Sequence, residues 1–391
     1  MSVIRPFKIA IPQSDLDELR ARLARTRWPG EETVDDWRQG PRQQQMQQLC
    51  DFWRTEYDWR RCEATLNRFD QFLIGIDGID IHFLHVRSAA ADAVPLLLAH
   101  GWPGSILEFA RVIGPLSNPA AHGVPHAPAF HLVLPSMPGF GFSGKPVAPG
   151  WDINRIADAY VELMRRLGYE HWICQGGDLG SAVAEAIAHR RPPGCAGIHL
   201  NMSFFEPTPD EVEDADETER FYLARSHAFF DEQSAYYAVQ STRPQTIAYS
   251  LADSPVGQAA WIFDKLYEGA QHDGDIEEAL SRDDVLDNIT LYWLTNSGGS
   301  AARLYWELRR SRGTSPPPTI TLPTAYSGFA GETILASRRW LEKRFKRLVY
   351  YKIVSRGGHF AAWEQPQLFA REIRAMLPAL IQESHERRIN R

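Results

Sequence analysis

The sequence of 391 residues predicts an α/β protein with a mostly parallel central sheet and helices on both faces. Apolar runs that suit buried strands, such as 95–99 and 131–135, alternate with segments of helical periodicity. Two helical blocks stand outside this alternation, one at the start of the chain and one after residue 204. We therefore predict four parts: an N-terminal helical segment that wraps the core (1–70), the first part of the core (71–204), an inserted helical lid (205–315) and the second part of the core (316–391).

The first 70 residues contain at least two amphipathic helices. Leu16, Leu19 and Leu23 share one helical face, and Ser14 is the expected N-cap. A second helical pattern runs from Gln43 towards Trp59. Because helices this short are marginal alone, we expect them to pack against the main domain.

The core begins with a hairpin whose strands, 72–76 and 79–86, flank Asp77-Gly78. After it we expect, in order, a central strand at 95–99, a helix at 106–113, a strand at 131–135, a helix at 153–167, a strand at 172–174 and a strand at 197–201. The lid follows and ends at Pro316-Pro317-Pro318; strands at 319–326 and 348–354 and a terminal helix containing Phe369, Ile373 and Met376 complete the core.

The stretch from His171 to His189 predicts a strand, a sharp Gly-rich turn and a helix. Asp178 occupies the centre of the turn, where α/β-hydrolases present their nucleophile. The helix N-terminus should keep this carboxylate ionised. Attack by a carboxylate on an sp3 carbon gives an alkyl ester of the enzyme, so the expected substrate is an epoxide or an alkyl halide. The alternative interpretation is that Asp178 merely caps the helix.

An acid and a histidine follow in the order typical of α/β-hydrolases. His359 lies in the Gly-rich loop after the last strand, and Glu332 lies just after the preceding one, where it can orient the imidazole. Glu332 could equally be a solvated loop acid and His359 a surface residue. Asp283 and Asp287, in the lid, are weaker candidates for the acid.

Motifs spread over nearly the whole chain resemble those of the microsomal-type epoxide hydrolase family. They are Pro6-Phe7-Lys8, Arg22-Leu23, Arg27-Trp28-Pro29, His100-Gly101-Trp102-Pro103-Gly104-Ser105, Pro135-Ser136-Met137-Pro138-Gly139-Phe140-Gly141-Phe142-Ser143, Gly176-Gly177-Asp178, Ser241-Thr242-Arg243-Pro244, Asp253-Ser254-Pro255-Val256-Gly257 and Gly357-Gly358-His359-Phe360-Ala361-Ala362. The resemblance implies an α/β-hydrolase fold and hydrolysis of an epoxide to a vicinal diol through an aspartyl ester, without a cofactor.

The resemblance also implies roles for individual residues. Two lid tyrosines, Tyr236 (or its neighbour Tyr237) and Tyr305, would donate hydrogen bonds to the epoxide oxygen. The backbone N–H groups of Trp102 and Leu179 would form the oxyanion hole. Candidates for the pocket wall are Tyr237, Phe142 and Phe360. The chain departs from the family at two positions: Leu179 follows the nucleophile where Trp is usual, and Ala330 stands where Pro is usual.

Composition limits the partners and the location. The net charge of −7 is spread along the chain without a basic run, so neither nucleic acid nor an anionic membrane is an expected partner. Cys50, Cys62, Cys174 and Cys195 should be free thiols in a reducing compartment. The start of the chain shows no signal peptide or membrane anchor, so we expect a cytoplasmic protein. A homodimer is one oligomeric state that the sequence allows.

We expect no metal site and no cofactor. His122 and His126 lie in a loop rich in Gly and Pro, which does not favour the helical i,i+4 pairing of metal ligands. The expected partner is therefore a small-molecule epoxide alone.

Two other functions fit the same fold. A haloalkane dehalogenase shares the Asp nucleophile but typically needs a Trp beside it to bind halide, and Leu179 has no side-chain N–H. A silent ligand-binding homologue is the other alternative, and the intact set of Asp178, Glu332 and His359 argues against it.

Overall fold

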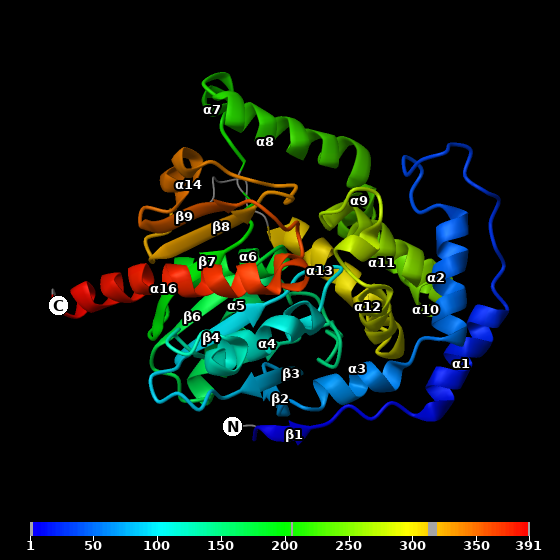
Figure 1. Cartoon of the computed structure of the whole chain (residues 1–391), viewed down its shortest axis with the longest axis horizontal. Coiled ribbons are helices and arrows are strands. Elements are labelled where there is room, and N and C mark those ends of the chain that lie inside the picture. Colours follow the sequence, from blue (N-terminus) through cyan, green and yellow to red (C-terminus); the bar gives the residue numbers. More distant parts are fainter. Residues whose placement is uncertain (1–2, 205, 312–318, 390–391) are drawn as a thin grey trace.

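A computed structural model describes residues 3–204, 206–311 and 319–389, with side chains up to residue 381. Figure 1 shows a twisted sheet between two layers of helices, with a helical lid beside it and the N-terminal segment running around both. The expected lid terminus at Pro316–Pro318 and the first lid residue, 205, lie outside the described residues.

The sheet has nine strands in the order β1-β2-β3-β5-β4-β6-β7-β8-β9. The strands β1 to β3 pair in antiparallel fashion, β3 joins β5 antiparallel, and all pairs from β5 to β9 are parallel. Their bounds are Arg5–Phe7, Gln71–Ile76, Ile79–Val86, Val94–Ala99, Phe130–Pro135, Trp172–Gly176, Cys195–Leu200, Thr324–Phe329 and Leu348–Val354. The predicted fold class, an α/β protein with a mostly parallel sheet, is confirmed.

Two strands differ from the sequence-based expectation. Strand β1 pairs with β2 and was not expected, because three residues are too few for a period-two pattern. Strand β8 begins at Thr324, whereas a strand was predicted from residue 319; Ile320 forms only an isolated bridge to Phe345. Pro323, which lacks a backbone N–H, separates the two pieces.

Helices cover both faces of the sheet (Figure 1). Helix α4 (Ala110–Ser117) packs with α16 (Pro366–Ile389), and α5 (Ile153–Arg166) packs with α6 (Leu179–Arg190). The helix expected at 106–113 is split into a short η1 (Ile106–Phe109) and α4. The short helix α15 (Ala361–Glu364) and helix α14 (Arg338–Arg344) complete the second part of the core.

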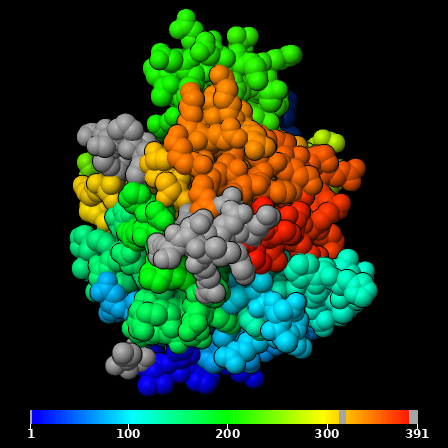
Figure 2. All heavy atoms as spheres, turned by 90° about the vertical axis from the view of Figure 1, so that its left-hand side faces the viewer, coloured from blue at the N-terminus to red at the C-terminus, as the bar shows by residue number. Residues whose placement is uncertain are grey.

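The described residues of the lid contain helices and no strand. The helices are α7 (Pro209–Glu213), α8 (Glu217–Ala228), η3 (Phe229–Gln233), α9 (Ala235–Thr242), α10 (Pro244–Asp253), α11 (Pro255–Gly269), η4 (Ile276–Glu278), α12 (Arg282–Leu294) and α13 (Gly298–Ser311). Helices α7 and α8 form an arm that projects from the body in both overall views (Figures 1 and 2).

The N-terminal helices α1 (Gln13–Ala24), α2 (Gln43–Thr55) and α3 (Trp59–Leu66) contact the lid helices α11 and α12. We expected these helices to pack against the main domain; this expectation was incomplete, because they also pack against the lid. Trp53 Nε1 donates to Thr290 Oγ1 of α12 at 2.8 Å, and both residues are buried. Pro12, not Ser14, stands at the N-cap of α1, and no side chain caps that helix.

Two expectations about single residues and helices can be checked here. All four cysteines are free and buried. Within the described residues, none of the helices combines the length and apolar character that crossing a membrane requires.

Candidate active site

Asp178 lies at the tip of the turn between β6 and α6, with φ 47° and ψ −130°. Residues with a Cβ rarely adopt these backbone dihedral angles, so the surrounding structure must hold Asp178 in this conformation. The neighbouring glycines explain how: a Cβ on Gly176 would lie 2.1 Å from the Gly180 oxygen, and one on Gly180 would lie 2.0 Å from the Ala99 oxygen. The Asp178 side chain makes no capping hydrogen bond to α6. The alternative interpretation, a simple helix cap, is wrong.

The carboxyl group of Asp178 is buried against backbone N–H groups. Trp102 N–H donates to Oδ1 at 2.8 Å, and the N–H of Leu179 also interacts with this carboxyl. Burial nevertheless raises the pKa of Asp178, because it outweighs the opposing effects of His359 and of the two N–H groups. The sequence-based expectation that the helix N-terminus keeps this carboxylate ionised omitted the larger effect of burial.

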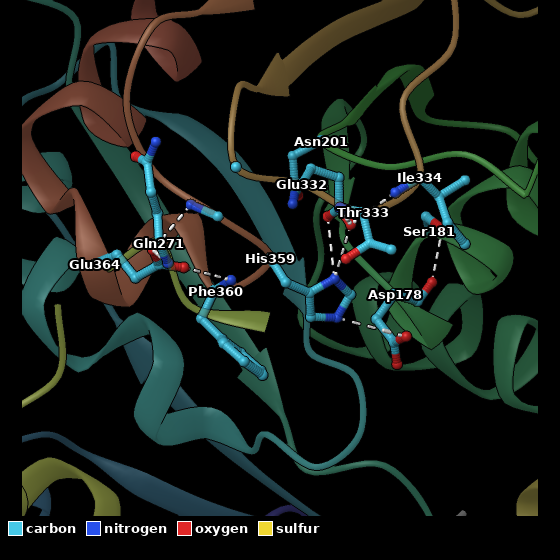
Figure 3. A network of polar contacts seen from close by, with 12 residues as sticks. Asp178, Ser181, Asn201, Gln271, Glu332, Thr333, Ile334, His359, Phe360 and Glu364 are labelled. Carbon is cyan, nitrogen blue, oxygen red and sulfur yellow. Dashed lines mark hydrogen bonds and ion pairs between the residues drawn. The ribbon is translucent and has the colours of Figure 1, made fainter. Parts of the chain in front are cut away.

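His359 lies between two carboxyl groups, as Figure 3 shows. Its Nδ1 is 3.0 Å from Glu332 Oε2, and its Nε2 is 3.6 Å from Asp178 Oδ2. Burial disfavours the imidazolium ion, but the charge and hydrogen bond of Glu332, together with the charge of Asp178, raise the pKa of His359 to about 10. The imidazole is therefore protonated at neutral pH in the free enzyme.

Glu332 is fully buried, so it is not a solvated loop acid. It follows β8, and its Oε1 accepts the N–H groups of Thr333 and Ile334 at 2.7 and 3.2 Å. The structure does not bring the two weaker candidates to the histidine. Asp283 and Asp287 both form ion pairs with Arg61 in the N-terminal segment.

Tyr236 and Tyr305 come from the lid and meet above Trp102. The Tyr236 ring stacks on the Trp102 ring at 4.9 Å, and the Tyr305 ring stands edge-on to both at 5.9 Å. The buried Tyr305 hydroxyl makes no hydrogen bond of good geometry among the described residues, but it lies close enough to the Tyr236 hydroxyl for a weak hydrogen bond to affect the pKa of both phenols. Burial raises the pKa of both phenols most; the charge of Asp178 is the next cause for Tyr236, and Tyr236 followed by Asp178 for Tyr305. Two protonated phenols therefore lie near the carboxyl group.

Of the two adjacent tyrosines, the geometry favours Tyr236 over Tyr237 as the first donor. Tyr236 stacks on Trp102, whose N–H binds Asp178, and the Asp178 charge acts on it. Tyr237 lines the same cavity and packs edge-on against Tyr305 at 5.7 Å.

These groups border one cavity of about 190 Å³. Asp178, His359, Tyr236 and Tyr305 form one part of its wall. The rest is largely apolar and includes Met202, Phe204, Phe229, Phe230, Leu308 and Ile334, with Lys265 and Glu268 among the polar residues. Such a wall suits a hydrophobic small molecule with few polar groups.

Two of the three pocket-wall candidates line this cavity, namely Tyr237 and Phe360. Phe142 does not. Its ring packs against Phe7 of β1 and His82 of β3, at 5.3 and 5.4 Å, so its role is to hold the edge of the sheet. Phe142 was a candidate for the pocket wall, but its place in a family motif does not fix the direction of its side chain.

A second, much smaller cavity of about 10 Å³ adjoins Asp178 and His359. Its wall includes Glu108, Gln175 and Asn201, and Gln175 Oε1 has no hydrogen-bond partner among the described residues. A polar space of this size holds about one water molecule. Burial raises the pKa of Glu108 to about 8. No sequence pattern marks these residues: Glu108 and Gln175 lie within a short helix and a strand, and Asn201 directly follows β7.

The described part of the chain contains no cluster of three or more His, Cys, Asp or Glu side chains that could hold a metal ion. His122 ends a short helix, η2 (Pro119–His122), at which a left-handed Gly123 follows.

The structure has a carboxylate on a sharp strand-to-helix turn, followed along the chain by an acid and a histidine in loops after later strands of the sheet. This arrangement defines an α/β-hydrolase. A family model for the alpha/beta hydrolase fold matches residues 94–252, and one for the epoxide hydrolase N terminus matches residues 4–109. The chain belongs to the microsomal-type epoxide hydrolase family, and it is an epoxide hydrolase.

Individual relatives agree with this assignment. The chain is 52% identical over 371 residues to a Stigmatella aurantiaca protein with the provisional name epoxide hydrolase, covering 95% of this chain and 84% of that protein. It is 31% identical to epoxide hydrolase 1 of Sus scrofa, covering 97% and 90%. The solved structure of Aspergillus niger epoxide hydrolase superposes with a TM-score of 0.86 at 31% identity, covering 97% of each chain.

Proposed function

We propose that this epoxide hydrolase acts through a covalent ester of Asp178, with His359 and Glu332 as the base and its orienting acid, and releases a vicinal diol. The observation that carries the proposal is that one cavity brings the carboxyl of Asp178, which a strained turn presents, together with the hydroxyls of Tyr236 and Tyr305. A nucleophile and two hydrogen-bond donors that border one small space suit the opening of a three-membered ring.

In the first step the Asp178 carboxylate attacks a ring carbon and forms a C–O bond. The C–O bond of the ring at that carbon breaks, and its electron pair moves to the ring oxygen. Tyr236 and Tyr305 donate hydrogen bonds to this oxygen, and one of them supplies the proton that makes it a hydroxyl. The product is a hydroxyalkyl ester of Asp178.

In the second step a water molecule attacks the ester carbonyl while His359 removes its proton. The N–H groups of Trp102 and Leu179, which already interact with this carboxyl, receive the oxyanion. The ester bond breaks, the leaving alkoxide takes from His359 the proton that came from water and completes the diol, and the Asp178 carboxyl group so formed gives its proton back to the tyrosinate, which restores the carboxylate and the phenol. The small cavity beside Asp178 and His359 offers a place for this water that a substrate in the main cavity does not fill.

The test is turnover in ¹⁸O-labelled water with a styrene oxide probe, followed by mass spectrometry of the peptide that contains Asp178. Repeated turnovers should introduce label into that peptide. His359→Gln should accumulate the ester as a stable mass increase, whereas the matched control His227→Gln, an exposed histidine of α8, should not. Label confined to the diol, with no adduct in His359→Gln, would refute the covalent route.

The cavity and the cysteines support two broader parts of the proposal. A largely apolar wall favours epoxides with aromatic or aliphatic substituents. Four free, buried thiols suit a reducing compartment such as the cytoplasm. Fractionation of cells that produce the protein would test the location, and recovery in a membrane pellet would contradict it.

A further inference from the structure

The loop that carries His359 is hydrogen-bonded to the end of lid helix α11. We call residues 355–360 the histidine loop. His359 N–H donates to the Gly269 oxygen at 2.8 Å, and Gly357 N–H donates to Gln271 Oε1 at 2.6 Å. Both acceptors come from the chain segment in which α11 ends.

A single buried carboxyl group connects the same two segments. Glu364 Oε2 accepts the N–H groups of Gln271 and Gly358, each at 2.8 Å, and Oε1 accepts the N–H of Phe360 at 2.9 Å. Two of these donors flank His359 directly, and the third belongs to the lid. Figure 3 shows Gln271 and Glu364 on the side of the imidazole away from Asp178.

The close packing of the histidine loop against the end of α11 leaves little room for the loop to move. A Cβ on Gly358 would lie 2.4 Å from the Gly269 oxygen, and one on Gly331 would lie 2.7 Å from the Gly357 oxygen. Glu364 is 8% exposed, and leaving any of its donors unpaired in this setting would be costly. The backbone on both sides of His359 is therefore fixed by groups that do not touch the reacting atoms.

The nucleophile is held by other parts of the structure. Asp178 is positioned by β6, α6 and the N–H of Trp102. Among the described residues, the histidine loop reaches this turn only through the imidazole of His359. A change at Gln271 or Glu364 should therefore displace the imidazole and leave the carboxyl of Asp178 in place.

We propose that Gln271 and Glu364 are positioning residues that hold His359 for hydrolysis of the ester and couple this step to the lid. The proposal rests on the two-step function proposed above. The alternative is a purely structural role, in which Glu364 only stabilises the start of the short helix α15. A structural role would not distinguish between the two chemical steps, whereas positioning of the base affects the second step alone.

The test is step-resolved kinetics on Glu364→Gln, which replaces one accepting oxygen by a donor that faces N–H groups. Single-turnover alkylation should stay within about twofold of the parent enzyme, and hydrolysis of the isolated ester should slow by roughly ten- to a hundredfold. Ester should accumulate in the steady state. Gln271→Ala, which removes the single bond to Gly357, should show the same pattern with a smaller loss.

Two matched controls remove the same chemical groups from exposed positions: Glu342→Gln on α14 and Gln367→Ala on α16. Both should leave the two rate constants unchanged. Equal losses in alkylation and hydrolysis, or no loss in either, would overturn the positioning role. If Glu364→Gln does not fold, as judged by near-ultraviolet circular dichroism, Gln271→Ala decides the question on the same criteria.

The two proposals fail in different ways. If His359→Gln forms no ester, the covalent function is wrong, whatever the Glu364 variant does. If His359→Gln traps the ester and Glu364→Gln hydrolyses it at the parent rate, the covalent function stands and the positioning role is wrong.

Discussion

The charge on Asp178 should control the protonation of His359, and Asp178→Asn isolates this effect. Asp178 Oδ2 lies 3.6 Å from His359 Nε2. At an effective dielectric constant of roughly 20, removing one unit charge at this distance weakens the imidazolium ion by about 5 kcal/mol, or about three pKa units. Loss of a negative neighbour destabilises the cation, so the pKa of His359 should fall. The parent value is about 10.

Nuclear magnetic resonance titration of the labelled imidazole measures this change directly. The His359 signal is assigned by its absence in His359→Gln, and the intact mass shows whether the introduced amide has been hydrolysed to the acid. Glu342→Gln, which removes a surface carboxyl, is the control and should leave the titration unchanged. A midpoint in Asp178→Asn that stays within half a unit of the parent, or that rises, would refute the reasoning.

The result has a consequence for the catalytic cycle. Formation of the ester neutralises Asp178 just as the amide does, so it should also lower the pKa of His359. The imidazole is then a base at neutral pH only once the ester exists, when water must be activated. In the free enzyme the imidazole is protonated, so it would not act as a base before the substrate has reacted.

Three further predictions concern single side chains. Tyr305→Phe should slow alkylation by roughly a hundredfold and leave ester hydrolysis unchanged in single-turnover assays, because only ring opening needs the phenol. Gly101→Ala should abolish turnover while the protein still folds by circular dichroism, since its Cβ would lie 2.3 Å from Asp178 Oδ1. Thr290→Val should lower the free energy of unfolding in urea by about 1–3 kcal/mol, because Trp53 Nε1 would lose its buried partner; an unchanged midpoint would contradict it.

The parts of the fold that were predicted correctly are those in which local sequence decides structure. The apolar run 95–99 could only be a central strand, and it lies between β5 and β6. The turn at Asp178 was predicted because glycines flank Asp178 in the pattern of a nucleophile elbow, and the structure shows the positive φ of such a turn. Glu332 and His359 were found from their positions after consecutive strands, and the two side chains are in contact.

The failures concern properties that depend on distant parts of the chain. Burial, which raises the pKa of Asp178, depends on segments far along the chain, so an argument from the helix N-terminus alone left this effect out. Phe142 points to the edge of the sheet because β1 provides Phe7 as a partner. Glu364 and Gln271 are 93 residues apart, and no local pattern relates them.

The lid contributes to both chemical steps, through different residues. In the proposed mechanism its tyrosines donate to the ring oxygen in the first step. Its contacts with the loops that follow β8 and β9 concern the second: Arg225 of α8 donates to the Ala330 and Gly331 oxygens at 2.7 and 2.5 Å, and the end of α11 holds the histidine loop. Asp178, by contrast, makes no hydrogen bond to the lid among the described residues. Substitutions inside the lid can therefore alter the balance between ester formation and hydrolysis without changing Asp178, and a substrate that displaces the lid should affect the second step even where the first proceeds normally.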